Sequence, residues 1–158
     1  MRVIRHTKEE TLIELSRHEG TLLRDLFSQY PIASLDRRQL TQTGDPERFT
    51  EETELLREAL TEHAQENQKR LQTWLDAEGA LRLKESACYL RVSHDEINWI
   101  LQVLNDLRIG SWEQLGCPSQ IHLSLDAIAP EEVLTYWSME LTGLLQTLLL
   151  APPRDASP

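Results

Sequence analysis

Apolar residues recur every three or four positions along most of this chain, which is the spacing of one face of an α-helix. The start signals agree with that period. Ser16 and Ser93 each stand three residues before a glutamate, as in a capping box, and Pro46 and Pro130 occupy first-turn positions. The pattern therefore predicts four helices, over residues 17–29, 46–76, 94–115 and 130–150.

Two stretches depart from the helical period. Residues 2–6 and 11–15 mix apolar and polar positions on either side of a turn-like segment, so they form either a small hairpin or an extended arm. Residues 80–92 stay unassigned, because their alternation fits a strand only in part. The sequence thus predicts a mostly all-α fold: a single-domain helical bundle over residues 1–150, with a small N-terminal β-hairpin as an option, and a disordered tail over residues 151–158.

Composition and charge narrow the classes of function. Hydrophobic residues make up 40% of the 158 residues and charged residues 27%, a balance typical of a soluble globular domain. The formal net charge of −10 disfavours nucleic acid and membranes as partners, and the short basic stretch from 82 to 91 is interpreted as a solvated face. Polar residues interrupt the longest apolar segment, and the start of the chain lacks the apolar core of a signal peptide, so we expect a cytoplasmic location.

Residues that carry catalytic or metal chemistry are not grouped in this sequence. The five histidines show none of the spacings of helical metal sites, and glycine-rich phosphate loops and nucleophile motifs are absent. Cys88 and Cys117 have no disulfide-framework or metal-type spacing, so we expect two free thiols. No catalytic residue, metal or cofactor is therefore predicted.

One arginine stands on the apolar face of the third predicted helix. On a wheel of about 100° per residue, Arg108 falls between Ile97 and Leu101. Asn105 lies at the margin of this stripe, and Asp106 lies on the opposite, exposed side. A guanidinium stays charged in a protein interior, so it needs a partner there. Either Arg108 forms a buried ion pair that fixes helix register, or it binds an anion together with Asn105.

Glu140 is the predicted partner of Arg108. It is the single charged residue within residues 133–150, and it lies at the edge of the last helix's main apolar stripe. Two lone opposite charges on apolar helical faces are expected to meet when the helices pack antiparallel, with Asn105 completing the hydrogen bonds. The acids that remain open as alternative partners are Asp25, Glu54 and Glu58.

The last predicted helix is apolar on two sides. Its main stripe consists of Val133, Leu134, Trp137, Leu141, Leu144, Leu145 and Leu148. The second strip, with a small residue at its centre, consists of Tyr136, Met139, Gly143 and Leu150. Such a helix is either central in its domain or half of an interface, and central packing is preferred. A second strip left uncovered would predict a symmetric dimer contact.

The third helix also carries a short motif. The run from Trp99 through NDLRI to Gly116 resembles a bacterial family, common in actinobacteria, that is catalogued as a domain of unknown function with the number two thousand and seventeen. The matching residues are Asn105, Asp106, Leu107, Arg108, Leu115 and Gly116. Residues 112–114 depart from the expected Gly-Thr-Arg. A serine-capped, leucine-rich helix near the N-terminus and the final helix extend the resemblance over most of the chain. It implies a mostly α-helical single domain without an established reaction, with some relatives described as regulators in oxidative-stress responses.

Taken together, these features favour a binding protein over an enzyme. We expect a cytoplasmic helical domain that acts in protein interaction or regulation, with another protein or a second copy of the chain as partner. The alternative is a small anion-binding protein or enzyme that uses Arg108 and Asn105. An open pocket that exposes the Arg108 guanidinium would favour this alternative, and a buried guanidinium paired with a carboxylate would favour the first hypothesis.

Overall fold

The computed structural model describes residues 1–32, 50–77, 79–118 and 128–151. Almost all of the tail predicted over residues 151–158 lies outside these ranges. Within them the chain forms four α-helices, a short 3-10 helix and a four-stranded antiparallel sheet. The fold is therefore α+β, and the prediction of a mostly all-α helical bundle is wrong.

The sheet joins two hairpins that lie far apart in the sequence. Its strands, in the spatial order β1-β2-β4-β3, are β1 (Arg2–His6), β2 (Glu10–Ser16), β3 (Leu81–Leu83) and β4 (Ala87–Ser93). The N-terminal hairpin, one of the two options for these residues, is confirmed. β2 pairs with β4 over its full length, from Glu10 opposite Ser93 to Ser16 opposite Ala87. This long-range pairing makes one sheet of the two hairpins.

Alternation along the two central strands gives the sheet a covered and an open face, since successive side chains of a strand point to opposite sides. The buried positions on the covered face are Thr11, Ile13 and Leu15 on β2 and Cys88, Leu90 and Val92 on β4; Ala87, the first residue of β4, is buried as well. The second hairpin gives a weak sequence signal, because β3 has only three residues and short apolar runs fit a strand and a buried helix alike. The bundle prediction was wrong because it did not include this second hairpin.

The four predicted helices are present, and the bounds that the structure describes lie close to the predicted ones; the predicted helix start at Pro46 lies outside the described residues. They are α1 (Arg17–Ser28), α2 (Thr50–Asp76), α3 (His94–Gln114) and α4 (Val133–Leu150), the last preceded by the 3-10 turn η3 (Pro130–Glu132). The amide of Ser16 donates to the Glu19 carboxylate at 2.7 Å, and the amide of Ser93 donates to Glu96 at 2.9 Å. Both capping boxes are thus confirmed. Gly116 has a φ of 77°, the left-handed conformation expected just past a helix end.

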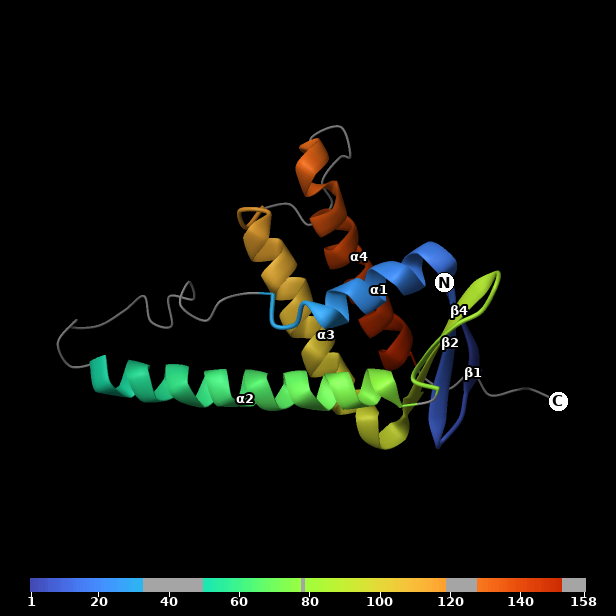
Figure 1. Ribbon diagram of the computed structural model, residues 1–158, viewed down its shortest axis with the longest axis horizontal. Helices are drawn as coiled ribbons and strands as arrows, with labels where there is room; N and C mark the ends of the chain where they lie inside the picture. The colour runs from blue at the N-terminus through green and yellow to red at the C-terminus, as the bar shows by residue number, and fades with distance from the viewer. Residues whose placement is uncertain (33–49, 78, 119–127, 152–158) are drawn as a thin grey trace.

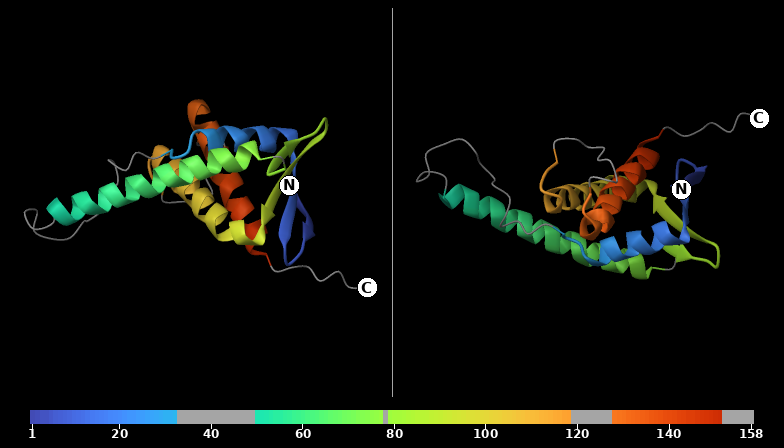
Figure 2. Two further views of the ribbon diagram at one scale, coloured as in Figure 1. Left: turned by 60° about the horizontal axis from the view of Figure 1, so that its bottom comes forward. Right: turned by 90° about the horizontal axis from the view of Figure 1, so that it is seen from above.

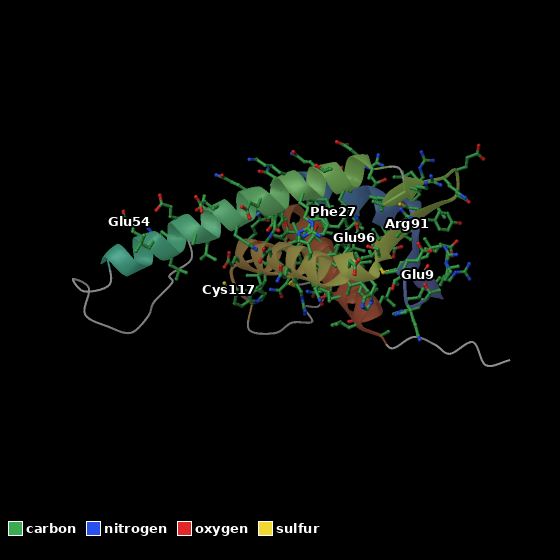
Figure 3. The ribbon with its side chains drawn as sticks, turned by 90° about the horizontal axis from the view of Figure 1, so that it is seen from below. Glu9, Phe27, Glu54, Arg91, Glu96 and Cys117 are labelled. Atoms are coloured by element: carbon green, nitrogen blue, oxygen red, sulfur yellow. The ribbon has the colours of Figure 1, made fainter. Side chains whose placement is uncertain are left out.

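The helices α1 and α3 contact the sheet, and α4 packs on both of them (Figure 1). The C-terminal half of α2 joins the same core through Leu71 and Trp74. Its N-terminal half extends beyond the other helices in every view, with the labelled Glu54 standing on the projecting end (Figures 2 and 3). None of the described helices is long and apolar enough to cross a membrane.

A single large apolar cluster fills the space between the sheet and the helices. Within it, Phe27, Trp74 and Trp99 form two edge-to-face contacts, each with ring centroids 5.9 Å apart. Gly20 lets α1 approach the sheet closely, because a Cβ at this position would lie 2.3 Å from the Cβ of Cys88. The core therefore occupies the sheet end of the molecule, and α3 and α4 extend from it.

Candidate functional site

The buried face of α3 is turned away from the predicted one. It consists of Trp99, Ile100, Val103, Leu104, Leu107, Gly110 and Ser111, and its centre lies roughly a quarter turn from Arg108. Two small residues on this face, Gly110 and Ser111, make the rotation possible. Ser111 donates its hydroxyl to the Leu107 carbonyl at 2.9 Å and needs no other partner. Arg108 therefore lies at the rim of the core, only partly buried, and not at its centre.

Arg108 lines an open cavity of about 600 Å³ between α1, α3 and α4. We call this cavity the α4 groove. Its lining is Met1, His18, Glu19, Leu22, Arg108, Trp137, Met139, Glu140, Leu141, Gly143, Leu144 and Thr147. The groove is thus mainly apolar, with Arg108 and a few polar groups along it.

The guanidinium of Arg108 rests on the backbone of α4 at Gly143. A Cβ built at Gly143 would lie 3.3 Å from Nε and 3.4 Å from Cζ of Arg108, so the absent side chain provides the space. In the described part of the chain, no hydrogen bond or ion pair joins Arg108 to Glu140, nor to any of the alternative acids. The two predicted partners share the groove without forming the predicted ion pair.

Glu19 does not supply the missing countercharge. Its carboxylate accepts the Ser16 amide at 2.7 Å and lies 3.6 Å from the amino group of Met1. These contacts hold the carboxylate at the N-terminus of α1. Arg108 is therefore the groove cation that an incoming carboxylate can pair with at the least cost, because no intramolecular bond has to break first.

Asn105 does not line the groove. Its side chain is exposed on α3, while Arg108 faces α4. The structure therefore brings together Arg108 and Glu140, but not the Arg108–Asn105 combination of the anion-site hypothesis.

The two apolar sides of α4 are also placed differently from the prediction. Tyr136 and Met139, from the strip predicted as an interface, are buried against Ile128, Leu115 and Val133. The other two members differ, since Gly143 lies under Arg108 and Leu150 is exposed. This strip is thus largely covered within the chain.

Two hydroxyl residues explain why the buried face of α4 differs from the predicted one. Ser138 and Thr142 are buried, and each hydroxyl donates to a carbonyl of its own helix, at 2.8 Å for Leu134 and 3.0 Å for Ser138. Satisfied in this way, they pack like small apolar residues. The helical wheel counted them as polar and therefore placed the inner face incorrectly.

The rotation leaves large apolar side chains of α4 in solvent. Leu134, Trp137 and Leu144 are 65%, 49% and 48% exposed. Trp137 and Leu144 line the α4 groove. An exposed tryptophan next to an apolar cavity is the kind of surface that marks an interaction site.

A buried polar network on the other side of α3 was missed by sequence reasoning. The Trp99 indole donates to the Asn67 side-chain oxygen at 3.0 Å, and the Tyr30 hydroxyl donates to Asp106 at 2.9 Å. The Asn67 amide lies 3.4 Å from the Tyr30 hydroxyl and 3.4 Å from Nδ1 of His63. Asp106, predicted to be exposed, is therefore a partly buried acceptor that ties α3 to the end of α1. The one available signal was Asn67 itself, a polar residue on the stripe that buries Leu71 and Trp74.

Both cysteines are free, as the sequence predicts: Cys88 is buried and Cys117 is exposed at the end of α3 (Figure 3). Burial raises the pKa of the Cys88 thiol, with Arg24 opposing the effect. A buried thiol with a raised pKa is a poor nucleophile. The described residues contain no group of three or more His, Cys, Asp or Glu arranged to hold a metal ion.

Comparisons with known proteins return no match: no family model, curated protein or solved structure corresponds to this chain. The resemblance to family two thousand and seventeen therefore stays a prediction that rests on its motif.

Proposed function

We propose that this chain is a non-catalytic protein-interaction domain whose docking surface is the α4 groove. The observation that carries the proposal is that exposed Trp137 and Arg108 line the same, mainly apolar cavity. Arg108 has no hydrogen bond or ion pair among the described residues. Tryptophan and arginine are the residues most enriched among the energetically dominant contacts of protein interfaces. A cytoplasmic location is part of the same proposal and is supported by the two free cysteines.

The chemistry of the groove defines the partner. Its apolar lining, with Leu22 on one side and Leu144 on the other, fits the apolar face of an amphipathic segment. Arg108 requires a carboxylate on that segment, since the guanidinium is partly buried and lacks a countercharge. The partner is therefore an apolar protein segment with an acidic side chain placed to reach Arg108.

A small organic anion is the second candidate ligand. The cavity of about 600 Å³ lies within the range of small-molecule sites, and Arg108 would hold the anion's carboxylate. We rank it second because Leu134 and Trp137 extend the apolar surface along α4, and a protein segment covers such a surface more completely.

Photo-crosslinking tests the proposal. A photoreactive phenylalanine analogue replaces Trp137, and the variant is expressed in the native cell and irradiated. We expect one predominant crosslinked protein, and we expect Arg108→Glu to abolish the crosslink, because the new carboxylate repels the acidic side chain of the partner. The same analogue at Gln65, an exposed position of α2, is the matched control and should not give this product.

Three results would decide against the docking surface. Identical crosslinks from Trp137 and Gln65 would show nonspecific contact, and a crosslink that survives Arg108→Glu would remove Arg108 from the site. A bound organic anion that native mass spectrometry finds in the purified protein, and that Arg108→Glu releases, would establish the second candidate instead. A crosslink to the chain itself would identify the partner as a second copy.

A further inference from the structure

The open face of the sheet concentrates positive charge. Strand register places Arg2, Glu14, Tyr89 and Arg82 in one row across β1, β2, β4 and β3. The next row runs from Arg5 through Leu12 to Arg91. Helices cover the opposite face, so these side chains point to solvent.

A second open cavity, of about 530 Å³, lies on this face. We call it the sheet cavity. Among the described residues, the charged side chains that line it are all positive: Arg5, Arg82, Lys84 and Arg91. The whole chain has a formal net charge of −10, so a cavity with four cations among its lining residues is a strong local departure from the average. Figure 3 shows the labelled Arg91 at this end of the molecule, away from the projecting end of α2.

Internal contacts neutralise only part of that charge. Glu10 lies between two guanidiniums, 2.5 Å from Arg5 and 3.7 Å from Arg91. One carboxylate cannot balance two guanidiniums. Arg82 has no ion pair or hydrogen bond from its side chain among the described residues. Lys84 lies over the ring of Tyr89, 5.0 Å from its centroid, which holds the ammonium group at the cavity without cancelling its charge.

We propose that the sheet cavity binds a compact multiply charged anion, a ligand that carries two or more linked phosphate groups. Guanidinium groups bind phosphate oxygens through paired hydrogen bonds, and several cations around one cavity favour dense negative charge. The site is separate from the α4 groove, since the two cavities share no lining residue.

The surroundings favour a compact anion over a nucleic-acid strand. Glu14 stands in the same row as Arg82, and Glu10 lies beyond Arg91 opposite Ser93, so a long polyanion leaving the cavity would pass a carboxylate. The overall negative charge repels a polymer along its length, whereas a small anion responds to charges within a screening length of about 8–10 Å. Lys84 occupies one face of the Tyr89 ring, which leaves less of the ring for base stacking. We therefore expect recognition of the phosphate chain itself.

Titration calorimetry with inorganic tripolyphosphate tests this site directly. Arg82→Glu should weaken binding by about tenfold or more, because it replaces an unpaired cation with an anion in the cavity. The matched control is Arg57→Glu, which makes the same charge change at an exposed position of α2. It should leave the affinity within about twofold, since roughly 28 Å of helix separates it from Asp76 at the sheet end of α2, well beyond the screening length of about 8–10 Å. Arg82 is exposed on an edge strand, and circular dichroism verifies that its variant folds.

Three further measurements show which phosphate-containing ligand the sheet cavity prefers and whether its binding is independent of the α4 groove. Equal affinities for tripolyphosphate and ATP would assign recognition to the phosphates alone, and a higher affinity for ATP would assign the site to a nucleotide. Trp137→Ser should retain binding, which would keep this proposal independent of the docking surface. Absence of tripolyphosphate binding, equal loss in Arg82→Glu and Arg57→Glu, or tighter binding of a thymidine oligonucleotide would each overturn the proposal.

Discussion

Asp106 and Arg108 stand two residues apart on α3, yet their surroundings differ completely. Asp106 faces the buried network, where it accepts a hydrogen bond from Tyr30 at 2.9 Å. Arg108 faces the α4 groove, where it packs on Gly143 and forms no hydrogen bond or ion pair within the described residues. The chain itself supplies a hydrogen-bond partner for Asp106, whereas we propose that an external group pairs with Arg108.

This difference assigns a structural role to the network that contains Asp106, and it is the basis of the binding role that we propose for the α4 groove. The network connects α1, α2 and α3, so each of its polar groups contributes only while its partner is present. The groove contains an exposed tryptophan and an arginine that has no hydrogen bond or ion pair among the described residues. Substitutions in the network should therefore affect stability, whereas substitutions in the groove should affect binding.

The largest expected effect is on the network side. Asn67→Ala removes the acceptor of the Trp99 indole and the amide that lies near Tyr30, and Asn67 is only 6% exposed. Leaving the buried Trp99 indole N–H without its acceptor, and removing the amide beside Tyr30, should lower the free energy of unfolding by about 2–4 kcal/mol. Urea denaturation measures the loss.

Asn98 provides the control, because it is an exposed asparagine on α3. Asn98→Ala should change stability by less than about 0.5 kcal/mol. If Asn67→Ala has an equally small effect, the network is not what holds α2 to the core.

An intermediate, pH-dependent effect is expected at Glu96, which caps α3 beside the network. Burial by itself would raise the pKa of Glu96, but hydrogen bonds from Ser93 and Trp74, together with the charge of Arg91, outweigh burial and lower the pKa below its usual value. A carboxyl whose pKa is lowered by folding stabilises the folded state above its unfolded-state pKa. This stabilisation is lost as the pH falls below about 4.3 and passes through the folded pKa.

Glu96→Gln should therefore destabilise the protein by about 1 kcal/mol at neutral pH. The difference from the original chain should shrink in acid, where both side chains are neutral. Thermal unfolding of both proteins over a pH series checks this. A difference that stays constant with pH would mean that the charge of Glu96 contributes nothing.

The smallest effect on stability is expected in the groove. Arg108→Leu should change the free energy of unfolding by about 1 kcal/mol or less, whereas breaking a buried ion pair would cost about 3–5 kcal/mol. A double-mutant cycle with Glu140→Leu measures the coupling of the two side chains directly. We expect the effects to add to within about 0.5 kcal/mol. A coupling well above that value would show that the two residues pair in solution, which would remove the contrast between the groove and the network.

The candidate site was predictable only in part. Arg108 and Glu140 were singled out from the sequence because each is a lone charge at an apolar helical face, and both do line the groove. Their relation was not predictable, since it depends on the rotation of two helices. Trp137 and Leu144 were assigned to an inner stripe, but buried Ser138 and Thr142 turn α4 so that these two large side chains face the groove.

The sequence by itself determined the elements that depend on neighbouring residues. Helical periodicity, the capping boxes at Ser16 and Ser93 and the glycine after α3 located the helices, because their geometry is set within one or two turns of chain. Only the tertiary structure decided the sheet, which pairs Leu12 with the distant Arg91. It also decided which side of α3 and α4 is buried. Both outcomes arise from contacts between segments far apart in the chain, where small or internally bonded side chains can replace large apolar ones.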